Sequence, residues 1–198
     1  MRDYGAQILL AFAVFPLVAL VTLAPWLVLR RRRGERTALG TMLLACALVI
    51  YLTGMVFLVL LPIPSFGGGY CARNAAQVQL NPFQFVADMR VIQGRGGPLL
   101  MGNQAFEVRA FNVLLFVPFG MLIRHICHRG ILLTAALGLL VSLAIELAQL
   151  TAVFWLFPCP WRTFDVDDLI ANTAGALLGA LAAPLLRLIP GQRTFTAP

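Results

Sequence analysis

Long apolar runs separated by short polar segments make up most of this chain. Five of them approach the roughly 20 residues that a helix needs to cross a bilayer: residues 8–29, 38–61, 106–123, 131–153 and 166–189. Their apolar residues are continuous and do not alternate with polar ones, as they would in a transmembrane barrel. Since a backbone in lipid must satisfy its own hydrogen bonds, such runs predict helices. We therefore expect an all-α polytopic transmembrane bundle that forms a single membrane domain over residues 1–198.

The composition supports a membrane protein and argues against a soluble one. Hydrophobic residues make up 60 % of the chain and charged residues 12 %, whereas soluble domains carry about 25 % charged residues. The net charge of +7 comes from arginine alone, because the chain has no lysine. These arginines lie in short tracts beside apolar runs, a pattern typical of membrane orientation and anionic-lipid contact. We expect membrane lipids as partners and no nucleic acid.

The arginine tracts also predict an orientation. With the N-terminus outside, residues 30–36, 124–129 and 187–193 all lie on one side of the membrane. These segments contain nine arginines and one acid, Glu35. The opposite side then holds six arginines and six acids. Because positively charged loops stay in the cytoplasm, the C-terminus is predicted to be cytoplasmic.

Polar residues within the last three runs are the candidates for chemistry. Four of the eight acidic residues lie between positions 146 and 168, and carboxylates in apolar segments are costly and often functional. Helical spacing places these side chains on the faces that the three runs turn toward each other. A rise of about 1.5 Å per residue puts them in the outer leaflet, where they would line a crypt open to the outside. We call this predicted set of ligand-binding residues the polar cluster: Asn112, Glu146, Gln149, Arg162, Asp165, Asp168 and Asn172.

Two roles for the polar cluster remain open. In one, Arg162 is the counter-ion of the carboxylates, and the ion pairs fix how the last two runs meet. In the other, the same groups hold a polar ligand or a cation. Carboxylates are ligands for Ca²⁺ or Mg²⁺, but their spacing does not match a calcium-binding loop. We therefore predict no metal site and no cofactor.

The two loops on the predicted outer side carry further features. Residues 83–92 place apolar positions at helical spacing, which favours a short helix at the membrane interface; an ordered loop that plugs the outer mouth of the bundle is the alternative. Cys71 and Cys159 lie in these two loops, where an oxidising exterior permits a disulfide. They pair only if their Cα atoms come within about 7 Å. Cys46 and Cys127 are expected to be free thiols.

Several motifs in the second half of the chain together resemble the VanZ-like family. They are Leu80-Asn81-Pro82-Phe83, the segment from Asn112 to Gly120, the segment from Ser142 to Gln149, and the segment from Arg162 to Ala176. The resemblance covers residues 80–181 and includes every member of the polar cluster. It implies a protein of the bacterial plasma membrane, similar to an accessory protein of teicoplanin resistance, in a family without an established biochemical activity.

Three functions are compatible with these patterns. The leading hypothesis is an envelope protein whose outer-leaflet crypt binds an amphiphile, such as a lipid-linked cell-wall precursor, a phospholipid or a lipoglycopeptide, with a link to glycopeptide tolerance. The second is a membrane-embedded enzyme with Glu146 as general acid or base on a lipid, although no nucleophile and base pair accompanies it. The third is a structural or partner subunit. The patterns do not predict an oligomeric state.

Overall fold

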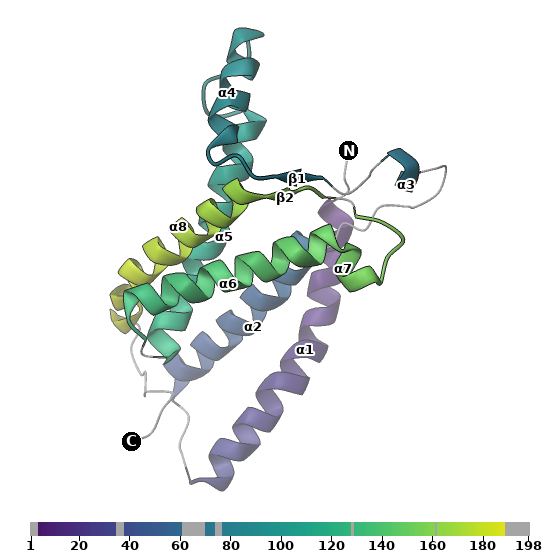
Figure 1. Cartoon of the computed structure of the whole chain (residues 1–198). Coiled ribbons are helices and arrows are strands. Elements are labelled where there is room, and N and C mark those ends of the chain that lie inside the picture. Colours follow the sequence, from purple (N-terminus) through teal and green to yellow (C-terminus); the bar gives the residue numbers. More distant parts are fainter. Residues whose placement is uncertain are drawn as a thin grey trace. The chain divides into compact units, whose positions relative to one another are not determined.

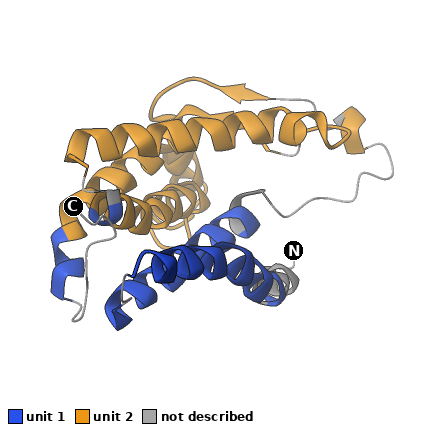
Figure 2. Cartoon of the chain, turned by 90° about the horizontal axis from the view of Figure 1, so that it is seen from below, with its two compact units in different colours: residues 1–63, 125–127, 184–198 blue, residues 64–124, 128–183 orange. Residues whose placement is uncertain are grey.

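The computed structural model is almost entirely helical, and it describes residues 4–34, 38–60, 70–73, 77–127, 129–160 and 162–188. Five of its helices are long and apolar enough to cross a membrane, which confirms the predicted all-α polytopic fold. The described chain divides into two compact units, which Figure 2 colours separately. We describe each unit by itself.

The first unit contains a helical hairpin of α1 (Tyr4–Arg32) and α2 (Leu39–Leu60), which pack on each other. Both helices are apolar all round, as expected for helices in lipid. The last turn of α1 carries Arg30, Arg31 and Arg32. Arg30 stacks over the Trp26 ring, with its guanidinium carbon 5.3 Å from the ring centroid. Such a stack retains a cation at the end of an apolar helix.

The second unit contains the other long helices (Figure 1). In chain order its elements are α3 (Tyr70–Arg73), β1 (Val78–Gln79), α4 (Gln84–Gly94), α5 (Gln104–Cys127), α6 (Ile131–Leu150), α7 (Ala152–Trp155), β2 (Phe164–Asp165) and α8 (Val166–Ala182). A 3-10 helix, η1 (Ala183–Leu188), continues α8 and spans the boundary between the units. The strands β1 and β2 form a short parallel pair, with Val78 opposite Phe164 and Gln79 opposite Asp165.

Small residues let α8 approach both of its neighbours closely. A Cβ added to Gly175 would overlap the carbonyl oxygen of Val113, and one added to Gly179 would overlap that of Val117. Gly120 of α5 faces the Ala176 backbone in the same way, and Gly138 of α6 faces the Ala176 side chain. Contacts of this kind replace the hydrophobic driving force that is absent between helices in lipid. Gly175 and Gly179 are four residues apart on α8, a spacing of small residues that permits close helix approach.

Two predicted boundaries differ from the observed helices for physical reasons. The third span is longer than residues 106–123 at both ends. Asn103 Oδ1 accepts a hydrogen bond from the Ala105 backbone amide at the start of α5, and Arg124 near its end donates to the Ala180 carbonyl oxygen. The fourth run was expected to reach Val153, but α6 ends at Leu150. Residues 152–155 have φ between 54° and 64°, which a right-handed helix cannot contain.

A helix, α4, forms where one was predicted in the loop between the second and third spans. α4 buries no residue against the bundle, and Figure 1 shows it rising beyond the β1–β2 pair beside the first turns of α5. Residues 61–69, which begin that outer loop, lie outside the described part of the chain.

Candidate functional site

The polar cluster lies where α5, α6 and the start of α8 meet, and the structure brings its members together. Asn112 comes from α5, and Glu146 and Gln149 come from α6. Asp168 and Asn172 come from α8, Asp165 is the N-cap residue of that helix, and Arg162 precedes it in the loop. α6 and α8 pack along each other, which brings residues of the two helices side by side.

The outermost level of the cluster is an ion-pair network centred on Arg109 of α5. Its Nη2 atom lies 2.5 Å from Asp165 Oδ2, and its Nη1 atom pairs with Asp168 Oδ1. The Asn112 side-chain amide also donates to Asp168 Oδ1. One guanidinium therefore connects α5 to two carboxylates at the beginning of α8.

This network adds one residue to the predicted set. The guanidinium that pairs with Asp165 and Asp168 belongs to Arg109. Arg162, the predicted counter-ion, contributes a positive charge that attracts the Glu146 carboxylate. Arg109 precedes Asn112 by three residues and so shares its helix face, which is the pattern that could have identified it.

Glu146 fixes the loop before α8 from inside the bundle. Its Oε2 atom accepts a hydrogen bond of 2.9 Å from the backbone amide of Asp165. The residue is 2 % exposed. Arg162 and Arg109 attract its carboxylate, while Asp165 repels it. Gln149, three residues further along α6, is buried as well.

The deepest level of the cluster pairs Asn172 with Ser142. The Asn172 amide nitrogen donates to Ser142 Oγ over 2.8 Å. Asn172 is 5 % exposed, and its Oδ1 atom has no hydrogen-bond partner among the described residues. Asn172 lies one turn below Asp168, and Ser142 lies one turn below Glu146, so this pair continues the polar face inward.

Asp167 holds the outer-loop segment against the cluster. Its carboxylate oxygens accept from the backbone amides of Phe83 (2.5 Å) and Phe85 (2.9 Å) at the start of α4. Phe83 has a left-handed backbone with φ of 64°, a conformation that costs a non-glycine residue about 1–2 kcal/mol. Nearby, Gln79 Nε2 donates to Asp165 Oδ1 over 3.1 Å. Neither Asp167 nor Gln79 was a predicted site residue.

The polar cluster is more enclosed than an open crypt. Its inner members Glu146, Gln149 and Asn172 are buried, and the side chains of Arg109 and Asp165 at its rim are only 16 % and 15 % exposed. The expected water-reachable hollow is not found at these inner positions, since Glu146, Gln149 and Asn172 are at most 5 % exposed. Among the described residues, no group of three or more His, Cys, Asp or Glu side chains has a metal-binding arrangement.

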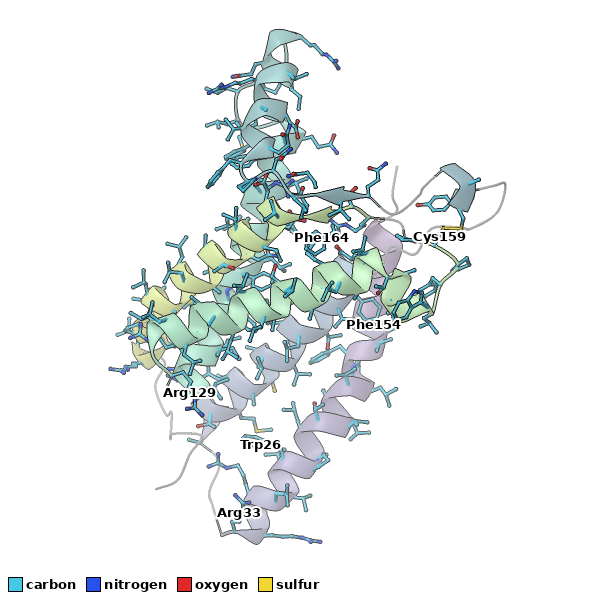
Figure 3. All side chains as sticks on the ribbon, in the orientation of Figure 1. Trp26, Arg33, Arg129, Phe154, Cys159 and Phe164 are labelled. Carbon is cyan, nitrogen blue, oxygen red and sulfur yellow. A yellow bond between two sulfur atoms is a disulfide. The ribbon has the colours of Figure 1, made fainter. Side chains whose placement is uncertain are left out.

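The structure joins Cys71 and Cys159 in a disulfide, with a Cα–Cα distance of 5.6 Å. Figure 3 shows the sulfur–sulfur bond beside the Cys159 label. The bridge connects two segments that are 88 residues apart in the sequence. Cys46 is a free thiol.

Comparison with known proteins identifies the family. The model of the VanZ/LLP1 family matches residues 48–187. This match begins within α2 and includes Cys71, so it is wider than the motif-bearing residues 80–181. No curated protein and no solved structure matches the chain. Together with its five membrane-crossing helices, the match shows that the chain is a multi-pass membrane protein that belongs to the VanZ/LLP1 family.

Proposed function

We propose that this protein acts in the bacterial plasma membrane by binding an amphiphile of the cell envelope at the polar cluster. The headgroup meets Asp165, Arg109 and Asn112 at the rim, and the acyl chains lie along the apolar surface of the spanning helices. The chemical classes that fit are a lipid-linked cell-wall precursor, a phospholipid and a lipoglycopeptide. Through such binding the protein contributes to glycopeptide tolerance, in keeping with its family.

The observation that carries the proposal is an excess of carboxylates between spanning helices. The cluster and the first turn of α8 hold four carboxyl groups, those of Glu146, Asp165, Asp167 and Asp168, whereas Arg109 and Arg162 supply two guanidinium groups. A structural ion-pair network in an apolar environment is most stable when its charges balance. The excess therefore favours a site that receives a further group.

The surroundings of the rim suit an amphiphile. Val78, Leu80 and Phe83 belong to the segment that Asp165 and Asp167 hold in place, and each of them is more than half exposed. Apolar side chains beside a partly exposed ion pair offer both a polar and an apolar surface to one ligand.

Direct binding tests the proposal. The purified protein is incubated with lipid II, with phosphatidylglycerol and with teicoplanin, and the dissociation constants are compared for the wild type, Glu146→Gln and Asp165→Asn. We expect at least one ligand to bind about tenfold more weakly to both variants, because a hydrogen bond to a charged group contributes about 1.5–3 kcal/mol. Asp88→Asn is the matched control, because Asp88 is an exposed carboxylate on α4 that bonds to Gln84. Equal affinities in all four proteins would contradict the proposal.

The ion pairs of Arg109 favour a structural role as the second candidate. They tie α5 to the start of α8 whether or not a ligand is present. If cluster variants that still fold show normal teicoplanin susceptibility and normal ligand affinity, the network serves to assemble the helices.

A further inference from the structure

One buried oxygen of the polar cluster, Asn172 Oδ1, has no hydrogen-bond partner among the described residues. We propose that the group the cluster receives is a protonated amine on the headgroup of the amphiphile, held by Glu146 and the side-chain oxygen of Asn172. This inference rests on the proposed function and specifies the chemistry of its ligand.

The first argument is the unpartnered oxygen of Asn172. A buried acceptor without a donor costs about 1–3 kcal/mol in a protein interior. The amide nitrogen of Asn172 donates to Ser142 Oγ. The atom without a hydrogen-bond partner is Oδ1, which is an acceptor. An acceptor requires a donor, which excludes a phosphate or carboxylate oxygen as the group bound at this position.

The second argument is the distribution of donors around the carboxylates. Asp165 and Asp168 share the Arg109 guanidinium, and Asp167 accepts from two backbone amides. Glu146 receives the neutral backbone amide of Asp165, and its carboxylate faces repulsion from Asp165 as well as attraction from Arg162 and Arg109. The carboxyl groups of Glu146, Asp165 and Asp168 make the surroundings of the cluster acidic, so a cationic donor suits them better than a neutral donor.

The third argument concerns size and level. Ser142 and Glu146 lie one turn apart on α6, and Asp168 and Asn172 lie one turn apart on α8. One turn is a rise of about 5–6 Å, so Asn172 lies about that far along the helix axis from the carboxylates of Glu146 and Asp168. An ammonium group is compact and carries three donors, so it can serve the Asn172 oxygen and a carboxylate together. Glu146 and Asn172 are 2 % and 5 % exposed, so a compact ammonium group fits this place better than a whole headgroup.

Two kinds of envelope amphiphile carry such an amine, an aminophospholipid and a lipoglycopeptide. The experiment therefore has two arms. In the first, the purified protein is equilibrated with an equimolar mixture of phosphatidylethanolamine, its N-acetylated form and phosphatidylglycerol with identical acyl chains, and the bound lipids are quantified by mass spectrometry. In the second, the affinities of teicoplanin and N-acetylated teicoplanin are compared.

We expect the free amine to be retained about tenfold over its acetylated form in at least one arm, because acetylation removes the charge and two of the donors. The arm in which the preference appears identifies the source of the amine. The preference should disappear in Glu146→Gln and weaken in Asn172→Leu, and it should persist in the Asp88→Asn control. Acetylation changes the ligand and leaves the protein intact, so this comparison does not depend on whether a variant folds.

Equal retention of amine and acetylated ligand by the wild type in both arms would overturn the inference. If the Glu146→Gln and Asp165→Asn variants still bind those ligands more weakly, the proposed amphiphile site stands and only its amine preference is lost. If cluster variants also bind like the wild type, the proposed function fails as well.

Discussion

Arg109 of α5 and Asp168 of α8 form an ion pair in which the side chains are 16 % and 10 % exposed. The same guanidinium reaches Asp165 through its other terminal nitrogen. Because all three side chains are largely removed from water, each charge depends on the others for compensation. The start of α8 is therefore attached to α5 by electrostatics at one end and by glycine packing further along.

Replacing Arg109 should destabilise the protein strongly. Arg109→Ala leaves two largely buried carboxylates without their guanidinium, a type of loss that costs about 3–5 kcal/mol. Arg109→Lys should fall between the wild type and Arg109→Ala, because an ammonium group cannot bridge two carboxylates as the planar guanidinium does. Thermal unfolding of the purified protein measures the difference. Arg90→Ala, at an exposed position on α4, is the control and should leave the transition unchanged; a similar loss in both alanine variants would contradict this role of Arg109.

Local spacing accounts for what the sequence could predict. The apolar runs determine the five helices, and helical periodicity puts Asn112, Glu146 and Asn172 on facing sides. Periodicity does not choose between Arg109 and Arg162 as the partner of Asp165 and Asp168, since both arginines belong to the predicted outer side. That choice follows from where α5 begins and how closely it approaches α8.

The role of Asp167 could not be predicted from the sequence for a different reason. Its partners are backbone amides of Phe83 and Phe85, more than 80 positions away. Every residue except proline has a backbone amide, so the residue type does not show which amide will bind a carboxylate. The left-handed conformation of Phe83 is also uncommon for an aromatic residue.

Asp167→Asn should loosen the start of α4. An asparagine side chain has one acceptor oxygen in place of two, and its NH₂ group would face a backbone N–H as a second donor. We expect faster hydrogen–deuterium exchange at Phe83, Phe85 and the following turn of α4, with unchanged exchange across α6. Asp88→Asn provides the comparison on the same helix. Unchanged exchange at Phe83 and Phe85 in Asp167→Asn would show that the carboxylate does not hold this segment.

Gly179→Ala should weaken the packing of α8 on α5. The added Cβ overlaps the Val117 carbonyl oxygen, which belongs to the backbone and cannot rotate away. Overpacking typically costs about 1–3 kcal/mol, and the helices must separate to relieve it. Gly54→Ala on α2 is the matched control, because its Cβ meets nothing within 4 Å and alanine favours a helix over glycine by up to about 1 kcal/mol. Unfolding temperatures should therefore move in opposite directions, and a fall of equal size in both variants would contradict the packing argument.

The disulfide provides a test of the predicted orientation. Stable disulfides form in oxidising compartments, and the arginine tracts place the loops of Cys71 and Cys159 outside the cell. In a variant with Cys46→Ala and Cys127→Ala, a membrane-impermeant maleimide should leave intact cells unlabelled until an impermeant reductant is added. Both remaining cysteines should then react.

The reciprocal variant supplies the control for that experiment. With Cys71→Ser and Cys159→Ser, Cys46 remains within the spanning helix α2, where the impermeant reagent cannot reach it in intact cells. If Cys71 and Cys159 react after reduction only when the cells are permeabilised, their loops lie in the cytoplasm and the polar cluster opens toward the opposite leaflet. An amphiphile from the cell exterior could then not reach Asp165 and Arg109 directly. The orientation of this bridge therefore determines whether the rim of the cluster is available to an antibiotic or a cell-wall precursor.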